Sequence, residues 1–96
     1  MRFSRETIAQ VESLRRHYLA KGRPEAARNL TIALRTAIRK IVAGQSLSAP
    51  RPYPDLARDG EAWTHAGRYW IAHTTAKSPV ILGVFYDAAD IPNRRQ

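Results

Sequence analysis

The side chains that could act as nucleophiles, general bases or metal ligands are few in this sequence and widely spaced. His17, His65 and His73 share no ligand spacing, cysteine is absent, and no phosphate-binding glycine loop or HExxH motif occurs. None of the serines stands in a nucleophile-elbow context: Ser4, Ser13, Ser46, Ser48 and Ser78. The sequence therefore predicts no metal site, no cofactor and no catalytic site of these kinds.

One acidic pair, Asp87 and Asp90, follows the last predicted strand at a spacing of three residues. Two carboxylates so placed can contribute ligands to a cation site, or they can cap a turn in solvent. We expect the second arrangement.

A third pattern is the stretch AGRYWIAHTT, residues 66–75, which alternates as a half-buried strand does. One face would carry Tyr69, Ile71 and His73, and the other would carry Trp70, Ala72 and Thr74. Both faces therefore hold aromatic or apolar groups, and Arg68 directly precedes this alternating run. The pattern leaves open which face is the core and what the other face does.

Length and composition are those of one small globular domain, residues 1–96, with 44% hydrophobic and 25% charged residues. The absence of cysteine excludes disulfides and thiolate metal sites. No apolar stretch approaches the roughly 18–20 residues that span a bilayer, and no apolar run follows the first positive charges as in a secretory signal. We expect a cytoplasmic protein with no membrane association.

The charge is strongly positive and uneven. Sixteen Lys and Arg residues against eight Asp and Glu residues give a net charge of +8. Residues 1–50 hold ten basic and three acidic groups, a net of +7, and residues 51–96 hold six and five, a net of +1. Such a balance favours an anionic partner, either nucleic acid or an acidic protein, although it also serves solubility alone.

Two helices are predicted in the first half, over residues 4–20 and 24–43. Spacings of three and four give the first helix the stripe Ile8, Val11, Leu14 or Arg15, and Tyr18. They give the second helix the stripe Ala27, Leu30, Leu34, Ala37 or Ile38, and Ile41. Ser4 is a suitable N-cap, and Gly22 and Pro24 suit the end of one helix and the start of the next. Residues 4–43 are therefore predicted to form an antiparallel helix hairpin.

The second half reads as a connection followed by strands. Residues 44–61 are rich in proline and form a long connection, which Leu47, Tyr53 and Leu56 should fix to the body. Strands are predicted at 62–66, 68–75 and 79–87, followed by a basic tail over 88–96. The predicted fold class is α+β, with the helix hairpin on one face of a small antiparallel sheet.

Three motifs stand in a characteristic order: RPEAARNL opening the second helix, then GRYWIAH, then SPVILGVFYD. Their order and spacing resemble the ParE/RelE superfamily of bacterial type II toxin–antitoxin toxins, whose pattern is A-x-x-L, G-x-Y-R-I-x-Y and V-x-I-L-x-V. The resemblance runs from about Phe3 to Asp87. Many members also begin with a strand, and here only MRF precedes Ser4.

The resemblance implies that Tyr69, Ile71 and His73 face the core. Trp70 would then lie on the open face as a binding anchor, unless the proline-rich connection buries it. In the RNA-cleaving branch of the family, an arginine that stabilises charge at the scissile phosphate occupies the position of Trp70. An indole cannot do so, which favours the ParE-like branch, whose members bind and inhibit DNA gyrase.

The resemblance also implies a cognate acidic antitoxin and two sets of binding residues. Trp63, Arg68, Trp70, Tyr86, Arg94 and Arg95 are the candidates for binding the target. Val11, Leu14, Tyr18, Arg28, Arg35 and Arg39 are the candidates for binding the antitoxin. The alternatives are a RelE-like, ribosome-dependent mRNA-cleaving toxin and a non-toxic basic domain that binds nucleic acid. Direct nucleic-acid binding by the toxin would be secondary.

Overall fold

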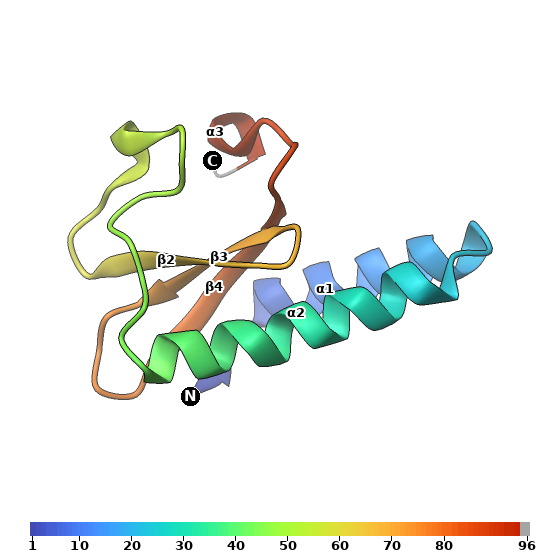
Figure 1. Cartoon of the computed structure of the whole chain (residues 1–96), viewed down its shortest axis with the longest axis horizontal. Coiled ribbons are helices and arrows are strands. Elements are labelled where there is room, and N and C mark those ends of the chain that lie inside the picture. The colour runs from blue at the N-terminus through green and yellow to red at the C-terminus, as the bar shows by residue number, and fades with distance from the viewer. Residues whose placement is uncertain (95–96) are drawn as a thin grey trace.

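Two helices pack on one face of a four-stranded sheet in the computed structural model, which describes residues 1–94 (Figure 1). The α+β class and the N-terminal helix hairpin are confirmed. In chain order the elements are β1 (Arg2–Phe3), α1 (Arg5–Ala20), α2 (Pro24–Val42), the 3-10 turn η1 (Pro54–Leu56), β2 (Glu61–Ala66), β3 (Tyr69–Thr74), β4 (Val80–Tyr86) and α3 (Ile91–Arg94). Within residues 1–94 no helix combines the length and apolar character needed to cross a membrane.

The hairpin begins and turns where the local chemistry predicts. Ser4 caps α1, because its hydroxyl oxygen accepts the backbone N–H of Thr7 at 3.1 Å. Gly22 adopts φ 67° after the end of α1, a conformation that side chains disfavour, and Pro24 opens α2.

Helix α1 closes the outer edge of β4. Ser4 N–H and the Thr7 hydroxyl both donate to the Ile81 carbonyl, at 2.9 and 3.0 Å. Further along, the Gln10 side-chain oxygen accepts Val84 N–H at 2.9 Å, and the Gln10 amide nitrogen donates to the Val84 carbonyl. The stripe prediction for Ile8 is wrong: Ile8 is 47% exposed, because the row that begins at Thr7 faces the sheet.

The sheet has the order β1-β4-β3-β2 and is mixed. Strands β2, β3 and β4 form the predicted antiparallel meander. Strand β1 pairs in parallel with β4, Arg2 with Val80 and Phe3 with Ile81, so the prediction of a wholly antiparallel sheet is wrong. The reason is topological, since the hairpin turns that force antiparallel pairing join only β2, β3 and β4.

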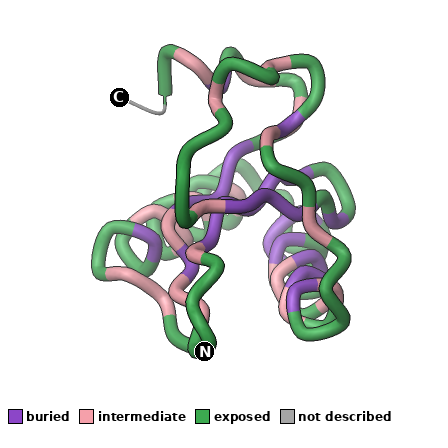
Figure 2. The backbone as a smooth tube through the Cα atoms, turned by 90° about the vertical axis from the view of Figure 1, so that its left-hand side faces the viewer, coloured by how far each residue is buried: buried purple, intermediate pink, exposed green. Residues whose placement is uncertain are grey.

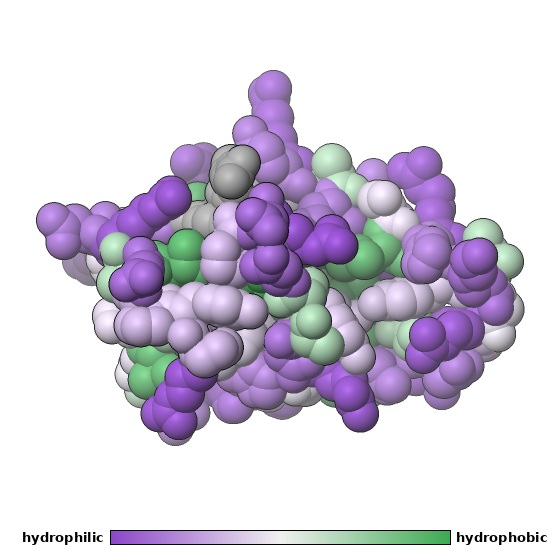
Figure 3. Space-filling view, turned by 90° about the horizontal axis from the view of Figure 1, so that it is seen from above, coloured by the Kyte–Doolittle hydropathy of each residue, from purple (hydrophilic) through white to green (hydrophobic). Residues whose placement is uncertain are grey.

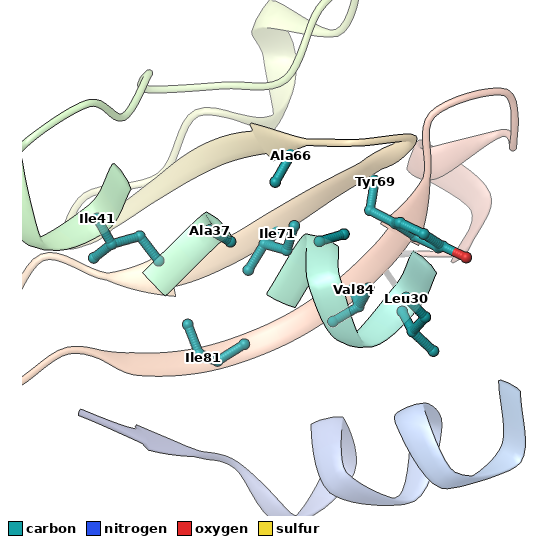
Figure 4. Packing of buried hydrophobic residues seen from close by; sticks show 9 residues of the cluster. Leu30, Ala37, Ile41, Ala66, Tyr69, Ile71, Ile81 and Val84 are labelled. Carbon is teal, nitrogen blue, oxygen red and sulfur yellow. The ribbon is translucent and has the colours of Figure 1, made fainter. Parts of the chain in front are cut away.

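The main core lies between the helices and the sheet. Figure 4 shows side chains of α2 facing those of all three long strands. The members of the main core are Leu30, Ala33, Ala37, Ile41, Ala66, Tyr69, Ile71, Ile81 and Val84. Small residues bring α2 close to the sheet, and a Cβ on Gly67 would lie only 3.3 Å from that of Ala33. Figure 2 shows the buried residues concentrated along the strands and along α2.

The opposite face of the sheet is also covered. Residues 44–60 and α3 lie above it in Figure 1, and seen from that side the molecule is mostly hydrophilic (Figure 3). Beneath them is a second cluster of Trp63, Trp70, Ala72, Phe85 and Ile91, against which Tyr53 and Leu56 pack as predicted. Leu47 fixes the connection through backbone hydrogen bonds to Trp63, both of 2.7 Å, while its side chain is 43% exposed.

Candidate functional site

Trp63 and Trp70 are core residues, so their prediction as exposed binding anchors is wrong. Trp63 is fully buried with its ring 5.6 Å from that of Phe85, and Trp70 is 7% exposed. The alternation of β3 was predicted correctly, because Tyr69 and Ile71 belong to the core beneath the helices and Trp70 lies on the other face. Helix α3 is not predicted from the sequence, which indicates only a basic tail there. Ile91 of α3 is fully buried in this cluster.

Arg68, Tyr86 and Tyr18 meet in a groove of about 820 Å³ on the helix side of the sheet. The groove lies between the first part of α2, the start of β3 and the end of β4. The family resemblance predicts Arg68 and Tyr86 as target contacts and Tyr18 as an antitoxin contact, and the fold places all three on one surface. Arg23, Ile32 and Tyr69 complete its main lining.

Three tyrosines form the aromatic wall of this groove. The hydroxyls of Tyr18 and Tyr69 are hydrogen-bonded at 2.7 Å, and the ring of Tyr86 meets that of Tyr69 edge-on at 5.9 Å. Burial, and then the hydrogen bond with Tyr18, raise the pKa of Tyr69 well above its usual value. Tyr86 is 41% exposed and Ile32 is 51% exposed, so both present apolar surface to a partner.

The rim of the groove is basic. The Arg23 guanidinium lies 5.9 Å from the ring centre of Tyr18, a cation–π distance, and its 3.9 Å ion pair with Glu25 is solvent-exposed and weak. Arg68 lies exposed in the tight turn between β2 and β3, and its carbonyl accepts the N–H of Asp87 at 2.9 Å. The described lining residues include no serine, cysteine or histidine.

The other predicted site residues lie elsewhere. Val11 and Leu14 are half-buried and pack against the main core, so they offer a partner little surface. Arg94 is exposed on α3, and Arg95 lies outside the described residues. The remaining predicted antitoxin contacts, Arg28, Arg35 and Arg39, are exposed along α2.

The histidines and the acidic pair have local partners. His65 lies 3.2 Å from Asp87, and Asp90 accepts a hydrogen bond from Asn93 in the first turn of α3. His73 is buried, with Nδ1 hydrogen-bonded to the Thr74 carbonyl and Nε2 to the Ser46 hydroxyl, each at 2.8 Å. Across residues 1–94, no three acidic, histidine or cysteine side chains gather as a metal site.

Arg23, Ile32 and Tyr69 were missed as groove residues. Ile32 had a readable signal, because it is a large apolar residue off the stripe that α2 buries. The other two acquire their positions only when the hairpin and the sheet meet. Comparison with protein-family models, curated proteins and solved structures found no match to this chain.

Proposed function

We propose that this chain is a type II toxin of the ParE/RelE superfamily that acts in the cytoplasm by binding DNA gyrase and is neutralised by an acidic antitoxin. The arrangement of elements supports this proposal. GRYWIAH covers the β2–β3 turn and β3, and SPVILGVFYD covers β4. The hairpin packs on one face of the sheet, and the short β1 supplies the initial strand that many family members carry.

The burial of Trp70 is the observation that favours inhibition by binding over RNA cleavage. The RNA-cleaving branch needs an arginine at this position to stabilise charge on the phosphorane that develops. Here the position holds an indole that is 7% exposed and lies beneath the connection and α3. No cationic side chain can replace it there without removing part of the second cluster.

The groove is the surface through which such a toxin would bind. Tyrosine and arginine dominate the energetics of protein interfaces, and the exposed Tyr86 and Arg68 supply both. The net charge of +8 would accelerate association with an acidic antitoxin. Arg94, on the other side of the sheet, is the second candidate contact.

The test is expression of the chain without a partner, followed by two assays. We expect gyrase-catalysed DNA supercoiling to be inhibited and mRNA on translating ribosomes to remain intact. Arg68→Glu and Tyr86→Ala should lose the inhibition, whereas Arg58→Glu, an exposed change in the connection, should retain it. Codon-specific cleavage in primer extension would support the RelE-like alternative. Intact mRNA together with unaffected gyrase would support the remaining alternative, a non-toxic basic domain that binds nucleic acid.

A further inference from the structure

The outer side of α2 carries three arginines in a row, Arg28, Arg35 and Arg39, which we call the arginine ridge. Their spacings of seven and four residues place them on one side of a helix with 3.6 residues per turn. The buried residues of α2 recur on the opposite side, from Ala26 to Ile41. All three arginines are exposed, and α2 runs along the outside of the molecule in Figure 1.

No carboxylate neutralises the ridge in the described part of the chain. The ion pairs found there join Arg16 to Glu12, Arg23 to Glu25 and His65 to Asp87. The Arg39 guanidinium donates a 3.4 Å hydrogen bond to the Thr36 hydroxyl. Arg15 of α1 extends the positive surface, since it reaches across to the Thr31 hydroxyl of α2 at 3.4 Å.

The shape of the ridge favours a phosphate backbone over an acidic peptide. The ridge is about 16 Å long, from eleven residues at about 1.5 Å each, and its three arginines are not among the residues that line the groove. The exposed large apolar residues of α2 are Ile32, which lines the groove, and Val42, the last residue of the helix. A duplex presents a phosphate about every 3.4 Å along each strand, and its major groove, about 12 Å wide, admits a helix.

We infer that the arginine ridge binds duplex DNA through its phosphate backbone, without selecting a sequence. This activity goes beyond the proposed function, because neither gyrase inhibition nor neutralisation by an antitoxin requires it. It also assigns to DNA three arginines that the family resemblance gave to the antitoxin.

The experiment measures binding of the purified chain to a labelled duplex of arbitrary sequence, by fluorescence anisotropy, between about 50 and 200 mM salt. The test variant is Arg28→Gln/Arg35→Gln/Arg39→Gln. The matched control, Arg2→Gln/Arg51→Gln/Arg58→Gln, removes the same charge from exposed residues outside the helices. Thermal melts check that both variants fold. Gyrase and antitoxin are absent, so the result is independent of the proposed function.

We expect the affinity of the native chain to fall steeply with salt. Loss of three phosphate contacts should reduce the slope of log K against log salt by about 2.7, from about 0.9 per contact. The control should keep most of the slope. Equal losses in the two variants, or no binding by the native chain at the lowest salt, would overturn the inference. So would a test variant that still binds DNA normally but no longer binds poly-glutamate, since the ridge would then be a protein-docking surface.

Discussion

The hydroxyl groups of Tyr18 and Tyr69 lie 2.7 Å apart and join the last turns of α1 to the first residue of β3. The bond closes one wall of the basic, aromatic groove and ties the helix hairpin to the sheet at that end. Tyr69 is 5% exposed and belongs to the main core, so a single residue serves both the core and the groove. A change at Tyr69 should therefore alter both the stability of the fold and the wall of the groove.

The pH dependence of the folding stability should report the burial of the Tyr69 hydroxyl. Burial raises the pKa of Tyr69, so the folded chain keeps a proton that the unfolded chain loses near pH 10. Stability should therefore be unaffected by this group below about pH 10 and should fall as the pH rises further. Tyr69→Phe should flatten that fall and cost about 0.5–1.5 kcal/mol at neutral pH through the lost hydrogen bond. Thermal melts from pH 8 to 11 measure both effects. Tyr53→Phe, in the connection, is the control and should leave the alkaline fall in place.

Gln10 should contribute to stability more than an ordinary helix-surface residue does. Its amide pairs with both backbone groups of Val84 at the sheet edge. Gln10→Leu would leave the two groups unpartnered, at about 1–3 kcal/mol. Ser13→Ala, exposed on the same helix, should change stability by less than about 0.5 kcal/mol. Urea denaturation distinguishes the variants, and equal midpoints would show that water replaces the amide without loss.

The sequence predicted the elements that depend on local chemistry and failed where long-range packing decides. The Ser4 cap, the Gly22 and Pro24 turn and the period of β3 are local signals, and the structure confirms them. Trp70 is buried because residues 44–60 and Ile91 pack on the same face of the sheet. Neither segment has a hydrophobic periodicity from which this packing could be predicted. The groove likewise exists only where α1, α2 and the strand ends converge, so Arg23 carried no functional signal of its own.

Trp70→Ala should destabilise the fold rather than only weaken partner binding. The indole packs with Phe85 and Ile91 beneath the connection, and truncating a buried aromatic residue costs about 3–5 kcal/mol. That is a large part of the stability of a small domain. The thermal melt of the mutant should collapse or shift far down. Leu47→Ala, in the same region but 43% exposed, should melt close to the native chain. A Trp70→Ala melt that matches the native one would show that the buried indole does not stabilise the fold.

Association with an acidic antitoxin should depend on salt mainly through its rate. The +8 charge steers an acidic partner over distances that counterions screen, with a Debye length of about 10 Å at 0.1 M salt. We expect the association rate constant to fall between low and high salt while the dissociation rate changes little. Stopped-flow mixing measures both. An association rate constant that does not change between low and high salt would contradict the electrostatic argument for an acidic partner.

Ser46→Ala should loosen the connection without unfolding the domain. The Ser46 hydroxyl lies 2.8 Å from Nε2 of buried His73 and 2.9 Å from the Thr64 hydroxyl, so it fixes the start of the connection to β2 and β3. Removing it leaves a buried ring nitrogen with one partner fewer, while the backbone pairing of Leu47 with Trp63 persists. Arg58, exposed in the connection, is a trypsin site that reports local opening.

We expect trypsin to cleave Ser46→Ala faster at Arg58 than the native chain, by about two- to tenfold if the lost bond is worth about 0.5–1.5 kcal/mol. The exposed Ser48 provides the matched control, and Ser48→Ala should be cleaved at the native rate. Cleavage at the exposed Arg16 of α1 reports global unfolding and should not change. If Ser46→Ala accelerated cleavage at Arg16 as much as at Arg58, the hydroxyl would stabilise the whole fold, and the connection would not open separately.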